Sequence, residues 1–339
     1  MKSALQNGVL PRLLELAERQ DLLPALATRI DEQPTIKAIL SDAERQQLDQ
    51  ALRDNTHHNM QTLMQALKLA RTLNCVGITP TFLKGTAQLL TVNNARLGFR
   101  KQLDIDLVVA PEDLEKACRV LLTAGYGFYR FPSKVKDEPG EFLDTEEAFR
   151  TSTAHHHLPS LVMDGYAMPV ELHRHFLPKR FQSRNPLEPL LNTANRHESH
   201  GAIFFVPSAE YQIIHTVLGK LVHDGYLARR DFPIREACDY IDLLEQTERK
   251  IDPGLVEQHC GENYRVFSQL VTALMAYRDQ TMNSSTIDIC RRLKLMEKRY
   301  NSSVIAQCLD VNARVTHLGQ QMLYSPAKLP AFFKRMLGR

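Results

Sequence analysis

The chain lacks a paired cysteine motif, a long apolar run and a strong net charge. No stretch approaches the roughly 20 apolar residues that a membrane-spanning helix needs. The stretch MKSALQNGVLPRLLELAERQ has no continuous apolar segment of the signal-peptide type. The cysteines stand far apart without CxxC spacing, which argues against a zinc ribbon and a disulfide framework; they are Cys75, Cys118, Cys238, Cys260, Cys290 and Cys308. We therefore expect a cytoplasmic protein with reduced thiols and no membrane span.

The charge balance is also close to neutral, with a formal net charge of +3 over 339 residues. This value favours neither a nucleic-acid partner nor a membrane surface. With 43% hydrophobic and 24% charged residues, the composition is that of a globular protein long enough for two or three packed units. Internal repeats and low-complexity segments are absent from the sequence.

Hydrophobic periodicity divides the chain into three zones. Residues 1–75 and 207–339 repeat their apolar side chains at helical spacing, which predicts an N-terminal helical segment and a C-terminal helical domain. Residues 76–206 alternate β-rich runs with helical ones and form the predicted core. The expected strands of this core are 78–84, 103–110, 126–131 and 168–176, and its helices follow Gly85 and cover 111–125. We predict an α+β fold.

Two aspartates, Asp104 and Asp106, interrupt the apolar run LDIDLVV. On a strand, positions two apart share a face, so both carboxylates point the same way. Like charges on a half-buried face repel each other and need compensation. A divalent metal would supply it, since Mg²⁺ takes hard oxygen ligands and keeps positions open for phosphates. Pairing with Arg96, Arg100 or Lys101 would supply it equally well, so both interpretations stay open.

A third carboxylate lies in VELHRHF, where Glu171, His173 and His175 occupy alternate positions. On a strand these three side chains share one face. A neighbouring strand would place Glu171 beside Asp104 and Asp106. Three carboxylates on adjacent strands, next to a glycine turn, are typical of two-metal phosphoryl transfer.

The stretch FLKGTAQLL predicts a strand that turns at Gly85 and opens a helix at Thr86. Free backbone N–H groups and the positive end of the helix dipole favour a phosphate there, and glycine allows it a close approach. Taken alone, the pattern is more often an ordinary turn with Thr86 as the N-cap.

The histidines offer an alternative in zinc chemistry. His155, His156 and His157, with His173 and His175, would provide enough imidazoles for a zinc-dependent hydrolase. However, HExxH spacing is absent, and the aspartate pair suits magnesium better. We expect His157 or His173 to orient a carboxylate or contact substrate, and His175 to be partly buried.

The C-terminal end is basic and contains interleaved apolar residues. It resembles a nucleic-acid or membrane contact, but we expect a solvated terminus. Its basic residues are Lys328, Lys334, Arg335 and Arg339.

The order LKGT, RxxxDIDLVV and VELHRHF, with HHHLP between the last two, resembles the nucleotidyltransferase superfamily with a DNA polymerase β-like core. More narrowly, it is similar to a bacterial group of uncharacterised nucleotidyltransferases whose pattern runs LKG, RxxxDxDLLV and [DE]LH. The resemblance covers roughly residues 20–250 and is strongest from 82 to 176. It implies a polymerase β-like core, a short mixed sheet with helices, flanked by helical segments.

The resemblance also implies a metal site. Asp104 and Asp106 match the family's DxD carboxylates, which hold Mg²⁺ or Mn²⁺. Glu171 matches the third carboxylate, which completes this site and helps to deprotonate the acceptor hydroxyl. The chain departs from the family in three ways. The separation between Gly85 and Asp104 is longer than in the broad superfamily pattern, although the narrower group tolerates it. Leu103 replaces a frequent glycine, and Glu171 stands where many relatives have aspartate.

The resemblance also implies a nucleotide-binding site. Lys84, Gly85 and Thr86 match the turn that cradles the triphosphate of a nucleotide such as ATP. Arg100 occupies the family's arginine position and would neutralise phosphate charge. The implied activity transfers a nucleoside monophosphate to a hydroxyl group of an acceptor and releases pyrophosphate.

Two questions stay open at this stage. The acceptor is a small molecule, a protein or an RNA, because fold-level analogy does not choose among them. The chain would alternatively be a catalytically silent nucleotide-binding or interaction module. Degenerate members of such families often lose one of the three carboxylates, and here all three are present.

Overall fold

The computed structural model describes residues 10–92, 96–132, 140–226, 234–246 and 251–278. The chain divides into two compact units. One consists of Met1–Phe176 and Leu187–Ser208, and the other of Leu177–Pro186 and Ala209–Arg339. The basic C-terminal end lies outside the described residues. The three-zone division of the sequence stays a prediction.

The first unit is built on an eight-stranded sheet with the order β4-β3-β5-β6-β2-β1-β8-β7. β2 pairs with β6 and β1 with β8 in parallel, and the other neighbours are antiparallel. The mixed sheet with its helices confirms the predicted α+β class. The strands are β1 Thr81–Phe82, β2 Ile105–Val108, β3 Gly127–Arg130, β4 Glu141–Leu143, β5 Ser160–Val162, β6 Val170–His173, β7 Asn195–Ser199 and β8 Ala202–Val206.

The longest helix of this unit is α5, Asp42–Asn74, which begins with a capping box. The Ser41 hydroxyl accepts from the Glu44 N–H, and the Glu44 carboxylate accepts from the Ser41 N–H. The other helical elements are α2 Leu10–Arg19, α3 Leu23–Asp31, α4 Pro34–Lys37, α6 Lys84–Thr91, η3 Pro111–Asp113, α7 Leu114–Thr123, α8 Thr145–Thr151, η4 Ser152–Ala154 and α10 Leu187–Thr193.

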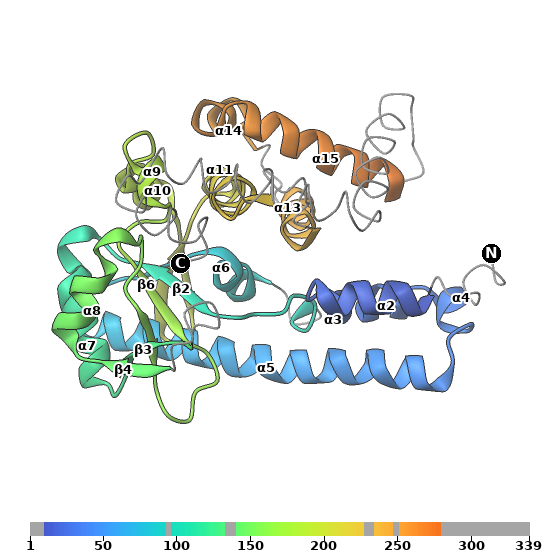
Figure 1. Ribbon diagram of the computed structural model, residues 1–339, viewed down its shortest axis with the longest axis horizontal. Coiled ribbons are helices and arrows are strands. Elements are labelled where there is room, and N and C mark those ends of the chain that lie inside the picture. Colours follow the sequence, from blue (N-terminus) through green and yellow to red (C-terminus); the bar gives the residue numbers. More distant parts are fainter. Residues whose placement is uncertain (1–9, 93–95, 133–139, 227–233, 247–250, 279–339) are drawn as a thin grey trace, which may run out of the picture. The chain divides into compact units, whose positions relative to one another are not determined.

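Helix α5 carries one face of the sheet (Figure 1). Its C-terminal half buries Leu69 and Leu73 in a core that includes Ile105 and Leu107 of β2. Because side chains alternate along a strand, Asp106 points to the opposite face. The N-terminal half of α5 joins a second apolar cluster with α2 and α3. One helix thus supports both the sheet and the N-terminal helices.

Two buried asparagines of α5 hold the loop that leads into β2. The amide of Asn55 donates to the carbonyls of Gly98 and Arg100, at 2.6 and 3.2 Å. The amide of Asn59 donates to the carbonyls of Leu97 and Arg100, at 2.6 and 2.7 Å. Loop carbonyls that would otherwise be buried without partners are satisfied in this way. Arg100 is therefore anchored through its backbone.

The ladder between β2 and β6 is shorter than the sequence predicts. It extends from the pair Ile105 and Val170 to the pair Val108 and His173. Asp104 precedes it and His175 follows it, so neither lies on a strand, which corrects our expectation for both. The ladder ends at His173 because the next two N–H groups, including that of His175, donate to the carbonyl of His156.

The described part of the second unit is helical. Its elements are α9 Lys179–Gln182, α11 Ala209–His215, the π-helical η5 Thr216–His223, α13 Ile234–Gln246, α14 Pro253–Cys260 and α15 Glu262–Arg278. The Asp252 carboxylate caps α14 by accepting from two backbone N–H groups. The predicted helical pattern after residue 207 is thus confirmed where the structure describes it.

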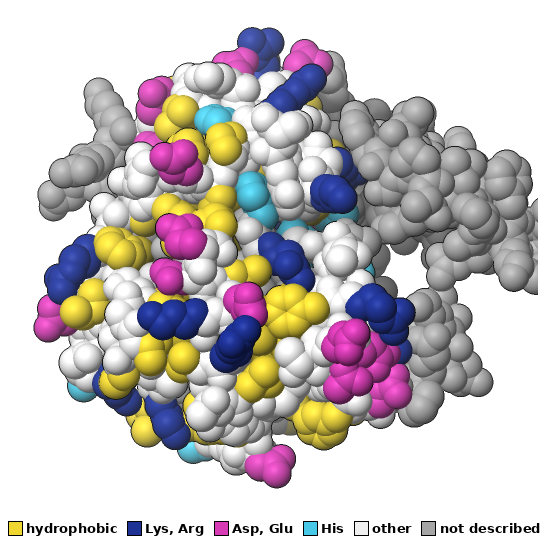
Figure 2. All heavy atoms as spheres, turned by 90° about the vertical axis from the view of Figure 1, so that its left-hand side faces the viewer, with side chains coloured by type: hydrophobic (Ala, Val, Ile, Leu, Met, Phe, Trp, Pro, Cys, Tyr) yellow, Lys and Arg dark blue, Asp and Glu magenta, His cyan; other side chains and the backbone are white. Residues whose placement is uncertain are grey.

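The surface carries mixed charge. Figure 2 shows basic and acidic side chains interspersed with hydrophobic ones on one face, as the small net charge suggests. Among the residues that the structure describes, we find no helix with the length and apolar character to cross a bilayer. Of the cysteines within the described ranges, Cys75, Cys118, Cys238 and Cys260 are not part of a disulfide.

We predict that Asn59→Ala destabilises the protein by about 1 to 3 kcal/mol, because two loop carbonyls lose a buried donor. Thermal or denaturant unfolding measures the change. Met60→Ala is the matched control, since Met60 is the next residue of α5 and is 50% exposed. Equal effects of the two substitutions would contradict a supporting role for Asn59.

Candidate functional site

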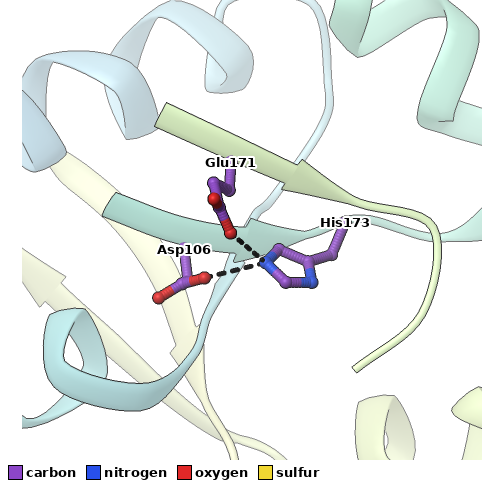
Figure 3. A group of neighbouring side chains, drawn as sticks. All are labelled: Asp106, Glu171 and His173. Carbon is purple, nitrogen blue, oxygen red and sulfur yellow. Dashed lines mark hydrogen bonds and ion pairs between the residues drawn. The ribbon is translucent and has the colours of Figure 1, made fainter. Parts of the chain in front are cut away.

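The parallel pairing of β2 with β6 brings the site together. Asp106 lies opposite Glu171, and Val108 lies opposite His173. Both carboxylates point to the same imidazole nitrogen of His173 (Figure 3). The His173 Nε2 is 2.8 Å from Asp106 Oδ1 and 3.5 Å from Glu171 Oε2. These three residues offer ligand atoms that all lie within 4.8 Å of one another.

Lys84 also contacts this group. Its Nζ is 2.6 Å from Asp106 Oδ1 and 3.9 Å from Glu171 Oε2. The sequence left open whether a metal or nearby basic residues compensate the negative charge of the aspartates. In the structure, Lys84 and His173 compensate the charge of Asp106. Lys101 instead pairs with Asp21 at 2.7 Å, so our alternative of a bond from Lys101 to the aspartates is wrong.

The charges of the buried pairs support one another. Burial opposes ionisation of Asp106, but Lys84 and His173 outweigh it and hold its pKa well below the ordinary value. The pKa of Glu171 is lowered against burial by the same two cations. Burial likewise disfavours the charge on His173, yet its hydrogen bonds with the two carboxylates raise its pKa. The group is thus a cluster of mutually neutralising charges.

Asp104 lies close to this cluster, and no ion pair of its carboxylate is found among the described residues. Burial and the negative charge of Asp106 raise the pKa of Asp104 to about 6, and Glu171 adds to the effect. Lys84 opposes the rise but does not cancel it. The three acids predicted from the sequence are therefore electrostatically coupled, and Asp104 is the one whose pKa is raised.

Thr86 supports the site from helix α6. The helix begins at Lys84 after Leu83, so our expectation that Thr86 is its N-cap is wrong. The buried Thr86 hydroxyl instead accepts from the Asp106 N–H at 3.1 Å and donates to the Asp104 carbonyl at 3.4 Å. The Thr86 side chain thus holds the start of β2. Its hydroxyl is engaged there and does not cap the helix.

The first turn of α6 offers backbone N–H groups that the helix itself does not use. The first bond of this turn runs from the Ala87 N–H to the Leu83 carbonyl. The N–H groups of Lys84, Gly85 and Thr86 precede this bond and have no acceptor within the helix. Backbone N–H groups at a helix start are typical ligands of phosphate.

Two side chains pack directly against Gly85. A Cβ atom there would lie 2.0 Å from Arg100 Nη1 and 2.3 Å from Gln102 Oε1. Arg100 Nη1 donates to Gln102 Oε1 at 3.0 Å, which places the guanidinium against the turn. The turn thus combines backbone donors with a positive charge.

His157 lies beside the carboxylates. Its Nδ1 is 2.7 Å from the Leu158 carbonyl, to which it donates, and its Nε2 is 3.9 Å from Glu171 Oε2. Burial lowers the pKa of His157, which favours a neutral ring. The rings of His156 and His173 are 5.2 Å apart. Within the described residues, neither His155 nor His156 belongs to the group of converging ligand atoms.

Sequence reasoning missed several supporting residues. It assigned Lys84 to the nucleotide and did not foresee its ion pair with Asp106. It also passed over Gln102 and the loop-anchoring Asn55 and Asn59. The asparagines offered a signal, because buried polar residues four apart share one face of a helix. Gln102 and the Lys84 ion pair offered none, since tertiary packing alone sets them.

The donor set fits a divalent metal. Asp106 Oδ2 is buried and has no hydrogen-bond partner among the described residues, while Oδ1 takes both Lys84 and His173. Two carboxylates on adjacent strands, with Asp104 nearby, are the hard oxygen donors that Mg²⁺ and Mn²⁺ prefer. The buried free oxygen is where such an ion would find its first ligand.

We predict that Asp104→Asn stabilises the metal-free protein above about pH 6. The pKa of Asp104 is raised from the ordinary 3.8 to about 6, so the free energy of unfolding falls as the pH rises between these values, and the full penalty is present above about pH 6. The substitution removes this penalty, and its melting temperature in a chelator should exceed that of the unsubstituted protein by a few degrees. The gain should shrink as the pH falls through about 6, because Asp104 is then neutral as well.

The exposed Glu112 provides the control for this measurement. Glu112→Gln should leave the melting temperature unchanged at both ends of the pH range. A gain from Asp104→Asn that does not depend on pH, or a loss at neutral pH, would contradict the repulsion argument.

The comparisons with known proteins agree with this geometry. Residues 10–279 match the model of a family described as uncharacterised nucleotidyltransferase. The match covers most of the chain and includes every residue of the site. No curated protein matches the chain. The chain belongs to this family of uncharacterised nucleotidyltransferases.

Proposed function

We propose that this protein is a metal-dependent nucleotidyltransferase. It transfers a nucleoside monophosphate from a nucleoside triphosphate to a hydroxyl group of an acceptor and releases pyrophosphate. The observation that carries the proposal is the alignment of Asp106 with Glu171 on adjacent parallel strands, with Lys84 at the start of α6 paired to Asp106. Family membership supports the same class of reaction.

Asp104, Asp106 and Glu171 would hold Mg²⁺ or Mn²⁺. When bound, the metal neutralises charge on the transferring phosphoryl group and activates the attacking oxygen. Thr86 keeps the two aspartates in place through its hydrogen bonds to their backbone. The acids can therefore converge on one ion without rearranging β2, which limits the entropy that binding costs.

The triphosphate binds at the turn that opens α6. The free N–H groups of Gly85 and Thr86 donate to phosphate oxygens, and the positive end of the helix adds to the attraction. Arg100, anchored by α5 and placed against Gly85, supplies a guanidinium to the same phosphates. These groups orient the leaving pyrophosphate and stabilise its charge.

The acceptor hydroxyl loses its proton on the Glu171 side of the site. Glu171 is ionised at neutral pH because Lys84 and His173 lower its pKa. His157 presents a neutral Nε2 near Glu171, and such a nitrogen can take a proton. Glu171 and His157 therefore form the pair through which the proton leaves.

Asp104→Asn and Glu171→Gln should each lower the rate of transfer by about 10²-fold to 10³-fold, because each removes a charge that acts on the reacting groups. Transfer of label from α-labelled triphosphates to components of a cell extract, with pyrophosphate release, measures the rate. The fraction that takes up label identifies the acceptor as protein, RNA or metabolite.

Melting curves distinguish a loss of activity from a loss of folding. Asp104→Asn should remain folded and inactive, and the exposed Glu112→Gln should remain active. Full transfer by both site variants would overturn the assignment. A triphosphate-dependent rise in melting temperature without pyrophosphate release would identify a binding module instead of an enzyme.

Gly85→Ala should weaken triphosphate binding about tenfold or more, because the methyl group displaces Arg100 and covers the backbone donors. Calorimetric titration with a nonhydrolysable triphosphate measures the affinity. The affinity for Mn²⁺ alone is the internal control and should stay unchanged, since Gly85 contacts no carboxylate ligand. Unchanged triphosphate affinity would place the phosphates elsewhere.

A further inference from the structure

Lys84 places a positive charge inside the candidate set of metal ligands. Its Nζ is 2.6 Å from Asp106 Oδ1 and 3.9 Å from Glu171 Oε2. The Asp106 side chain is 1% exposed, and the Lys84 side chain is 21% exposed. The ammonium group therefore contacts the two carboxylates that a divalent ion would use, and on Asp106 it occupies Oδ1.

The two oxygens of Asp106 have unequal surroundings. Oδ1 accepts from both Lys84 and His173, at 2.6 and 2.8 Å. Oδ2 is buried without a partner among the described residues. A divalent ion bound at Oδ2 and Glu171 would lie only a few ångströms from the ammonium, where two positive charges in a poorly hydrated site repel strongly. The Lys84 ammonium and a divalent ion therefore cannot occupy their positions beside Asp106 at the same time.

The backbone at Lys84 is unusual. Lys84 has φ +52°, in the left-handed region that a lysine rarely adopts. Its side chain reaches Asp106 of β2. Lys84 also immediately precedes Gly85, and its flexible stem would let the ammonium contact an anion at the first turn of α6.

We propose that Lys84 is a resident counter-cation that exchanges with the divalent metal. In the metal-free protein its ammonium neutralises Asp106 and Glu171. Metal binding moves the ammonium off Asp106, and the phosphates at the α6 turn receive it. The inference rests on the proposed function, because it uses the same ligands and the same turn.

The exchange predicts that the affinity for metal depends on whether a triphosphate is bound. Metal alone binds weakly, since it must displace an ion-paired ammonium. A triphosphate strengthens metal binding by giving Lys84 a new partner, and the coupling is reciprocal. A purely structural lysine would behave differently, because its removal would weaken the site for metal as well as the fold.

Lys84→Met and Lys84→Gln test the exchange through Mn²⁺ binding without nucleotide. Electron paramagnetic resonance of free Mn²⁺ gives the dissociation constant. Both neutral variants should bind Mn²⁺ about tenfold or more tightly than the unsubstituted protein, because no cation has to leave. Lys84→Gln keeps a hydrogen-bond donor for Asp106, so the test survives if Lys84→Met fails to fold.

Thermal melting is the second readout. Without metal, both variants should melt at lower temperature, since two carboxylates lose their counter-charge. Saturating Mn²⁺ should raise their melting temperatures more than that of the unsubstituted protein. Lys101→Met is the matched control: it removes a lysine from an ion pair of 2.7 Å with Asp21, away from the ligand set. Its Mn²⁺ affinity should not change.

Equal or weaker Mn²⁺ binding by both neutral variants, or no Mn²⁺ binding by any form, would overturn the exchange. This failure is separable from failure of the proposed function. Transfer activity in the unsubstituted protein, with no tighter binding in the variants, would reject the exchange alone. Tighter binding in the variants without any transfer activity would reject the enzyme and keep the exchange.

Discussion

The parallel register of β2 on β6 is the constraint on which the candidate site depends. It sets Asp106 against Glu171 and brings His173 within hydrogen-bonding distance of both. A shift of one residue would turn Asp106 into the apolar core and Ile105 out of it, at a large cost in free energy. Core packing and site geometry are therefore two results of a single pairing.

The buried acids require counter-charges, and the site obtains them within the protein. Lys84 and His173 both donate to one oxygen of Asp106, and the other oxygen has no partner within the part of the chain that the structure describes. If every polar atom of this network had a partner, it would be an ordinary buried salt bridge. The oxygen without a partner and the raised pKa of Asp104 distinguish it, because such features are typical of sites that a ligand completes.

Helix α5 links the fold to this chemistry. Its apolar side chains support the sheet, and its asparagines hold the loop that carries Arg100. Arg100 in turn lies against Gly85, in the space that a Cβ atom would occupy. The groups that we propose to bind phosphate are thus placed in part by contacts between α5 and a loop about 40 residues away, a separation that local propensity cannot convey.

The amino-acid sequence by itself determined the α+β class, the family and the residues worth examining: Asp104, Asp106 and Glu171 interrupt apolar patterns, and Gly85 sits where a strand meets a helix. Those signals are local, since they depend on periodicity and on residue type. Only the tertiary structure decided that Lys84 pairs with Asp106, that Thr86 holds β2 instead of capping α6, and that Asp104 lies before the strand. Each of these depends on where a ladder ends or which side chains meet across the sheet, and long-range packing sets both.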